Sequence, residues 1–395
     1  MKNASKAVTS IQAKALCVVA KVEKPGEACA EAKPAAKKAS KPIRESSAES
    51  SPKALSGETV GIDVGDRVSQ FCRLDAGGEI AEQGRLHTNA AGIEKHFAKL
   101  PAAVIALEAG TQSGWIARLL RHFGHQVVVA NPRDLAAVTS SKKKSDRNDA
   151  EKLARLARAD LKLLNPTYVR SLESARDAIP LRAREGFVRA RTQLVNVARS
   201  LAKIEGQRLP ATITKSFGER ALKELPAAMA ASMELLLRMI DFLSKAIEEA
   251  AGDIEFLLKT KYPEALKLMQ VPGVGSITAL SFVLSLGAPE RFRDSRDVGA
   301  FLGMTPKRKQ SGERDPRLGI SKAGNSTLRS LLVQCAHHIL GHYGKDSALR
   351  KWSQKLAARG GPNANKRAIV AVARKLSVIL HKLWRTGEDY MPFPA

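Results

Sequence analysis

The sequence is poor in aromatic and acidic residues. Aromatic side chains make up 5% of the 395 residues, so stacked aromatic platforms are not expected to dominate recognition. Lys and Arg number 65 against 39 Asp and Glu, for a formal net charge of +26. That excess predicts a polyanionic partner, and nucleic acid is the first candidate. A ribosome-associated or membrane-surface protein is the alternative.

Cysteine pairs and long apolar runs are also missing. No CxxC pair occurs, so neither a zinc ribbon nor a disulfide framework is indicated, and a reduced cytosolic setting is expected. No apolar run reaches the roughly 18 residues of a membrane span. Lys14 interrupts the short N-terminal run, so no secretory signal is predicted. The scattered cysteines are Cys17, Cys29, Cys72 and Cys335.

Four regions are predicted along the chain. Residues 1–57 are rich in Ala, Lys, Ser, Glu and Pro, which predicts a disordered basic tail. Residues 58–165 alternate short apolar runs with amphipathic segments. Residues 166–260 repeat apolar residues every three or four positions, which predicts two long antiparallel helices, a coiled coil that serves as scaffold. Residues 261–390 predict a second compact part, mostly helical and very basic.

The order of elements within residues 58–165 indicates a fold class. Three strands come first, in TVGIDVG, SQFCRLD and EIAEQGRLH, and the glycines of DAGGE turn the chain between the last two. A helix, the apolar strand AAVIALEA, a helix, the apolar strand QVVVAN and further helix follow. A three-strand meander followed by helix-separated strands predicts an α/β RNase H-like sheet with helices on both sides. A flavodoxin-like sheet would lack the meander.

Four carboxylates lie at the ends of predicted strands or on the last predicted helix. Asp63 ends the first strand and Glu108 ends the fourth, and RNase H topology makes those strands neighbours. A carboxylate directly after an apolar run is costly unless a cation faces it. Asp146 and Asp149 share one face of the last helix. The four together predict ligands for Mg²⁺ or Mn²⁺, two of which, about 4 Å apart, can clamp a scissile phosphate.

Each of these acids also has an ordinary explanation. Asp146 fits a helix N-cap, Asp149 a favourable charge in the first helical turn, and Asp63 a turn. The joint pattern in this order favours the metal site. Three further aspartates are expected in turns or on a helix surface and are not assigned to it: Asp66, Asp75 and Asp134.

The C-terminal part carries a hairpin and a serine within a basic loop. VPGVGSITA fits a helix-hairpin-helix turn whose backbone N–H groups face a phosphate; a tight turn between packed helices is the alternative. In TPKRKQSGERDPRLG, cations surround Ser311 and would stabilise charge on a phosphorus that it attacks. The alternative is a chance serine in a basic loop. Chemistry alone favours this alternative over a nucleophile. Ser330 is a competing serine, and Ser321 and Ser326 are interpreted as capping residues.

The residues predicted to contact nucleic acid come from the lysine run, the hairpin glycines and the basic loop. They are Lys142, Lys143, Lys144, Arg147, Gly273, Gly275, Lys307, Arg308, Lys309, Arg314, Arg317 and Lys322.

Four motifs, in this order, carry a family resemblance: KSDRNDAEKLARLA, VPGVGSITALSFVLSLG, FRDSRDVGAFLGMTPKRKQSG and GISKAGNSTLRSLLVQCA. Together with the four acids, they resemble DEDD-type insertion-sequence transposases of the IS one-ten type. The resemblance covers roughly residues 58–390. The long N-terminal tail departs from the family pattern, and SGERDP is more acidic than that loop usually is.

The resemblance implies an RNase H-like domain similar to Holliday-junction resolvases, a coiled coil, and a helical domain with a nucleophilic serine, for which Ser311 is the best match. It further implies recombination of an insertion element, guided by a structured RNA that the element encodes and that pairs with donor and target DNA. Dimers and tetramers are implied, in which the acidic domain of one subunit completes a site with the serine of another.

The hypothesis from the sequence is therefore a DNA transposase that acts at the nucleoid in a prokaryotic cytoplasm. Two rivals stay open at this point. A metal-dependent, structure-selective nuclease would use water as the nucleophile, and Ser311 would be a bystander. A basic architectural protein would fold RNA or DNA without catalysis.

Overall fold

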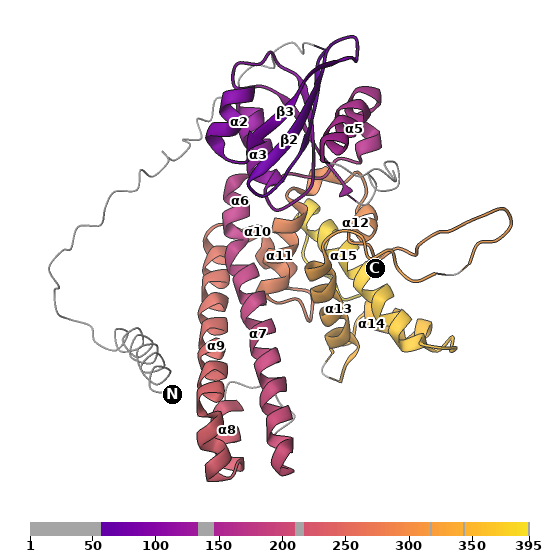
Figure 1. Cartoon of the computed structure of the whole chain (residues 1–395). Coiled ribbons are helices and arrows are strands. Elements are labelled where there is room, and N and C mark those ends of the chain that lie inside the picture. The colour runs from indigo at the N-terminus through magenta and orange to yellow at the C-terminus, as the bar shows by residue number, and fades with distance from the viewer. Residues whose placement is uncertain (1–56, 133–145, 210–216, 317, 343, 394–395) are drawn as a thin grey trace, which may run out of the picture. The chain divides into compact units, whose positions relative to one another are not determined.

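The structure is a computed structural model that describes residues 57–132, 146–209, 217–316, 318–342 and 344–393 (Figure 1). The predicted tail, apart from Gly57, lies outside the described residues, and so do the lysine run Lys142–Lys144 and Arg317.

A five-stranded sheet forms the N-terminal α/β part. Its strands are β1 (Thr59–Asp63), β2 (Val68–Leu74), β3 (Ile80–His87), β4 (Val104–Glu108) and β5 (Gln126–Ala130). The strand order is β3-β2-β1-β4-β5. β1, β2 and β3 pair antiparallel, whereas β4 pairs parallel with both β1 and β5. The predicted α/β sheet is confirmed, including the opening meander and the neighbouring positions of β1 and β4.

Helices cover both faces of this sheet because successive side chains of a strand point to opposite faces. Val60 and Ile62 belong to the same buried cluster as residues of α2 (Ala90–Phe97) and α3 (Ser113–His122). On the other face, α5 (Asp146–Ala159) packs Ala150 and Ala154 against Cys72 and Leu74 of β2. Leu153 and Ala157 of α5 pack against β4 and β5.

The chain continues through a 3₁₀ turn, η1 (Leu161–Leu164), into a helical region. Its elements are the short helices α6 (Leu172–Asp177) and α8 (Phe217–Glu224), the long helices α7 (Ile179–Ala202) and α9 (Ala227–Thr260), and the 3₁₀ turn η2 (Lys203–Glu205). α7 and α9 lie side by side (Figure 1). Ala178, just before α7, clusters with Leu258 near the end of α9, whereas Val195 clusters with Leu237 nearer the start. The two helices are therefore antiparallel, as predicted; the coiled coil stays a prediction.

The remaining described chain is mostly helical, which confirms the prediction for its C-terminal part. It comprises α10 (Pro263–Leu268), α11 (Ser276–Leu286), η3 (Pro289–Arg291), α12 (Asp297–Phe301), α13 (Ser326–Leu340), α14 (Ala348–Ala357) and α15 (Ala364–Thr386). α11 is buried from Thr278 onward and forms the centre of this core with α13 and α15. Among the described helices, none is both long and apolar enough to cross a bilayer. The boundaries of the four regions stay predictions.

Candidate active site

Asp63 and Glu108 meet at one edge of the sheet. β1 and β4 run parallel with Ile62 opposite Leu107, so the acids that follow these two residues leave the sheet side by side. Both acids line a cavity of about 280 Å³ formed with the loops that follow the two strands. The carboxyl ends of parallel strands are where α/β proteins commonly place ligands. This arrangement is consistent with the prediction from the sequence that Asp63 and Glu108 lie close together.

Asp66 lines the same cavity, although sequence reasoning left it out as a turn residue. The side-chain amide of Gln112 donates to the Asp66 carbonyl oxygen (2.9 Å) and to its carboxylate (3.2 Å). Gln112 is also the residue before α3, so this contact ties the loop after β1 to the loop after β4. The only sequence signal for Asp66 was its position three residues after Asp63.

α5 runs antiparallel to β1. A Cβ atom on Gly61 would lie 2.0 Å from the Ala150 carbonyl oxygen, so the absence of a side chain lets the helix approach the strand. Further along α5, the Arg158 guanidinium donates to the carbonyl oxygen of Gly57, which precedes β1 (3.5 Å). The first turn of α5 therefore lies toward the end of β1 that carries Asp63.

Asp146 and Asp149 occupy that first turn. Asp146 is exposed, and the Asp149 carboxylate accepts a hydrogen bond from Lys152 at 3.0 Å. Neither acid lines the cavity of Asp63 and Glu108. Within the described part of the chain, no three His, Cys, Asp or Glu side chains gather closely enough to hold a metal ion. The segment that leads into α5, residues 133–145, lies outside the described residues.

The residues present fit a divalent cation in their donor chemistry. Carboxylate oxygens are the ligands that Mg²⁺ and Mn²⁺ prefer, and Asp63, Glu108 and Asp66 are among the residues that line the cavity.

Arg147, predicted to contact nucleic acid, also has a structural partner. Its Nε donates to the side-chain oxygen of Gln83 on β3 (2.5 Å). The side-chain amide of Gln83 in turn lies 3.5 Å from Glu151. Arg147 therefore helps to hold the start of α5 over β3.

Ser311 lies in the predicted exposed loop, between α12 and α13. The two arms of this loop, residues 305–311 and 314–321, pair with each other and form the basic hairpin. The backbone N–H of Lys307 donates to the Gly319 carbonyl oxygen (2.9 Å), and that of Ser321 donates to the Thr305 carbonyl oxygen (2.8 Å). At the tip, Ser311 and Arg314 exchange two backbone hydrogen bonds, each 3.1 Å long. Ser311 is exposed at this turn.

Several basic side chains of the basic hairpin line one groove, and one of them forms an ion pair. Arg308 pairs with Asp315 (3.3 Å), so one acid of SGERDP neutralises one of the cations. Those that line one groove along the base of the hairpin are Lys307, Arg308, Lys309 and Lys322.

The turn between α10 and α11 packs against α13. Gly273 has φ +86°, and a Cβ there would lie 2.9 Å from the His338 ring. Gly275 caps α11 without a side-chain hydrogen bond. The tight packing supports the turn interpretation, and phosphate contact by the two glycines stays a prediction. Asn325, and not Ser326, caps α13, since its side chain accepts from the backbone N–H of Leu328.

Two family models match this chain. Residues 60–204, which include the four acids, match the DEDD transposase model DEDD_Tnp_IS110. Residues 265–353, which include Ser311, match the model described as the transposase IS116/IS110/IS902 family.

Relatives match over most of their lengths. The transposase for insertion sequence element IS1111A of Coxiella burnetii is 31% identical over 345 residues, which cover 84% of this chain and 90% of the relative. The transposase for insertion sequence element IS1328 of Yersinia enterocolitica is 27% identical over 326 residues, which cover 81% and 94%. The chain belongs to the IS116/IS110/IS902 family of insertion-sequence transposases.

Proposed function

We propose that this transposase cuts and rejoins DNA with an acidic site and a serine nucleophile. The observation that carries the proposal is the cavity at the carboxyl ends of β1 and β4, which Asp63 and Glu108 line together. The first turn of α5, with Asp146 and Asp149, points toward the same end of β1. In this proposal the four acids, carried by three elements, form one site at this end of the sheet.

The four acids would hold one or two Mg²⁺ or Mn²⁺ ions, which neutralise charge and polarise a phosphate when bound. Asp63 and Glu108 orient their oxygens from rigid strand ends. The hydrogen bond that Asp66 accepts from Gln112 ties together the loops that follow these two acids. Lys152 pairs with Asp149 (3.0 Å) and would leave it when a stronger cation takes its place.

Ser311 would supply the nucleophile. Its Oγ attacks phosphorus and loses its proton, the P–O bond within the DNA strand breaks, and the departing oxygen takes up a proton as a free hydroxyl. Rejoining reverses the exchange, since a strand hydroxyl attacks the phosphoserine and returns the proton to Ser311. The basic hairpin stabilises the charge that develops on phosphorus. The exposed position of Ser311 supports its access to a duplex.

The partners in this proposal are the DNA of the element ends and target, a structured RNA encoded by the element, and further copies of the chain as a homodimer or homotetramer. The exposure of Ser311 at the turn of the basic hairpin supports a site completed between subunits. The proposed location of the reaction is the nucleoid in a prokaryotic cytoplasm, where the element's DNA would lie.

One experiment tests this function against its rivals. The protein is incubated with element DNA, RNA transcribed from the element flanks and Mg²⁺, and protein–DNA adducts and joined products are measured. We expect wild type to form both, and Asp63→Asn and Ser311→Ala to lose at least about 100-fold in rate, which is typical when a group acting on the transition state is removed. Asp253→Asn and Ser232→Ala, on exposed positions of α9, are matched controls that should stay active.

The outcomes separate the candidates. If Ser311→Ala still cuts but forms no adduct, a metal-dependent nuclease is supported and the serine step is wrong. If Asp63→Asn is as active as wild type, the acidic site is wrong. If wild type binds nucleic acid but neither cuts nor joins it, the architectural role replaces the catalytic one.

A further inference from the structure

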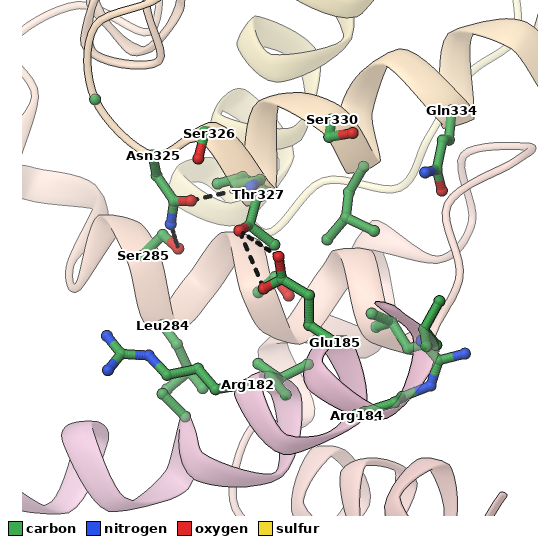
Figure 2. A pocket seen from close by; sticks show the side chains of 18 of the residues that line it. Arg182, Arg184, Glu185, Leu284, Ser285, Asn325, Ser326, Thr327, Ser330 and Gln334 are labelled. Carbon is green, nitrogen blue, oxygen red and sulfur yellow. Dashed lines mark hydrogen bonds between the residues drawn. The ribbon is translucent and has the colours of Figure 1, made fainter. Parts of the chain in front are cut away.

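A second cleft lies among the helices, between α7 and the pair α11 and α13. Its volume is about 530 Å³, within the range of roughly 300–1,000 Å³ for ligand pockets. Figure 2 shows Glu185 rising from α7 toward Thr327 at the start of α13, with Arg182 and Arg184 on either side of it. Arg170, just before α6, also lines the cleft.

The charge on the lining is unbalanced. It has one carboxylate, Glu185, against four arginines: Arg170, Arg182, Arg184 and Arg189. The carboxylate is already engaged, because the Thr327 hydroxyl donates to its two oxygens (3.1 and 3.2 Å) and Arg189 lies 3.3 Å away. Glu185 therefore neutralises one arginine and leaves three.

Those three arginines have no carboxylate within 4.0 Å among the described residues. The Nε of Arg184 is buried and lacks a hydrogen-bond partner within the described structure. Burial and the charge of Arg182 lower the pKa of Arg170, and burial and the charge of Arg191 lower that of Arg184. Because arginine stays protonated in proteins, these charges call for an anion rather than for proton loss.

The start of α13 adds to the positive field. Gly324, Asn325, Ser326 and Thr327 line the cleft, and a helix N-terminus carries partial positive charge. The Asn325 amide donates to Ser285 of α11 (2.9 Å), which joins the two helices at this edge. Arginine forks and helix N-termini both suit phosphate groups. In Figure 2, Arg182 and Arg184 extend to opposite sides of Glu185, so each would contact a different phosphate.

We propose that this cleft binds the phosphodiester backbone of a nucleic-acid strand, DNA or RNA, whose phosphates contact Arg170, Arg182 and Arg184. The proposal rests on the proposed function in that nucleic acid is the partner, and it adds a binding site apart from the acidic cavity and the basic hairpin. The volume leaves room for a sugar and base beside the phosphate.

The test measures how binding of full-length protein depends on salt. Labelled duplex DNA from the element ends and single-stranded RNA from its flank are titrated by fluorescence anisotropy at several salt concentrations, without Mg²⁺. Each lost phosphate contact should reduce the slope of log affinity against log salt by about 0.9 for duplex and about 0.7 for single strands. Arg182→Gln and Arg184→Gln should each show that reduction with one of the two probes, which identifies the source of the phosphate.

Two further variants guard against misfolding. Arg238→Gln removes the same charge from an exposed position on α9 and should leave the slope unchanged beyond error. Glu185→Gln removes the carboxylate of the cleft and should tighten binding of the same probe, a gain that loss of folded protein cannot produce.

The cleft is rejected if Arg182→Gln and Arg184→Gln keep the wild-type slope with both probes. It is also rejected if Arg238→Gln has the same effect as they do, because the response would then come from total charge. Strand cutting is scored separately on the same proteins. If the variants alter the slope but wild type does not cut, the cleft is supported and the catalytic proposal is rejected. If wild type cuts but the variants keep its slope, the catalytic proposal is supported and the cleft is rejected.

Discussion

At the scale of single residues, His381 on α15 shows how burial selects a protonation state. The ring is 0% exposed. Its Nε2 lies 3.0 Å from the Pro289 carbonyl oxygen, which only accepts, so this nitrogen carries the proton and Nδ1 accepts from the Ser295 hydroxyl at 2.9 Å. Burial lowers the pKa of His381, and the charge of Arg385 lowers it further. The hydrogen bond to the Pro289 carbonyl raises the pKa but does not outweigh burial. The folded protein therefore keeps this ring neutral.

A pH dependence of stability follows for His381. The unfolded chain takes up a proton near the ordinary pKa of about 6.5, whereas the folded protein takes it up only at lower pH. The free energy of unfolding should thus fall as pH drops below about 6.5. Urea unfolding midpoints of wild type and His381→Gln, measured between about pH 5 and pH 8, check this. The variant should be less stable at neutral pH and should lose less on acidification; an equal loss in both proteins would contradict the assignment.

At the scale of elements, the contact between β1 and α5 decides where the acids of the last helix lie. Gly61 is buried and leaves no room for a Cβ beside the backbone of Ala150 and Ala154. The approach is between backbone atoms, which cannot turn aside as a side chain does. The position of Asp146 and Asp149 therefore depends on a glycine in the neighbouring strand.

Gly61→Ala should displace α5 from the sheet. Overpacking of a tight core costs about 1–3 kcal/mol, and we expect a loss of that size in the free energy of unfolding. DNA joining should fall more than stability does, because the acids of α5 move away from Asp63. Gly252→Ala on α9, where no atom lies within 4 Å of the added Cβ, is the control. Thermal unfolding and DNA joining are measured on both, and a Gly61→Ala protein as stable and active as the control would refute this role.

At the scale of the whole molecule, charge dominates the expected binding behaviour. A net charge of +26 over 395 residues attracts polyanions regardless of sequence. Cations that neutralise phosphates release counterions, so affinity depends steeply on salt.

Affinity for random-sequence duplex DNA should therefore fall by about 10³-fold or more between about 50 and 200 mM salt, as for proteins with six to ten phosphate contacts. Anisotropy titrations across that range measure it, with heparin as a competitor that should displace the duplex. An affinity that hardly changes with salt would mean that the excess charge is not directed at the DNA backbone.

Local pattern predicted much of this fold and part of the site. Alternating and continuous apolar runs indicated the strands and their order, because side-chain periodicity is a property of neighbouring residues. The strand-end positions of Asp63 and Glu108 followed from the same runs, and the parallel pairing of β1 and β4 placed the acids side by side. The metal ligands and the role of Ser311 stay predictions.

The amino-acid order alone is enough to predict the set of elements, the strand-end acids and the basic charge, because each depends on residues close together in the chain. Only the tertiary structure brought Asp66 into the acidic cavity through Gln112 and joined Glu185 to Thr327, which lie 142 residues apart. Such contacts arise from the packing of whole helices and loops. A local sequence pattern does not show which side chains, far apart in the chain, become neighbours on folding.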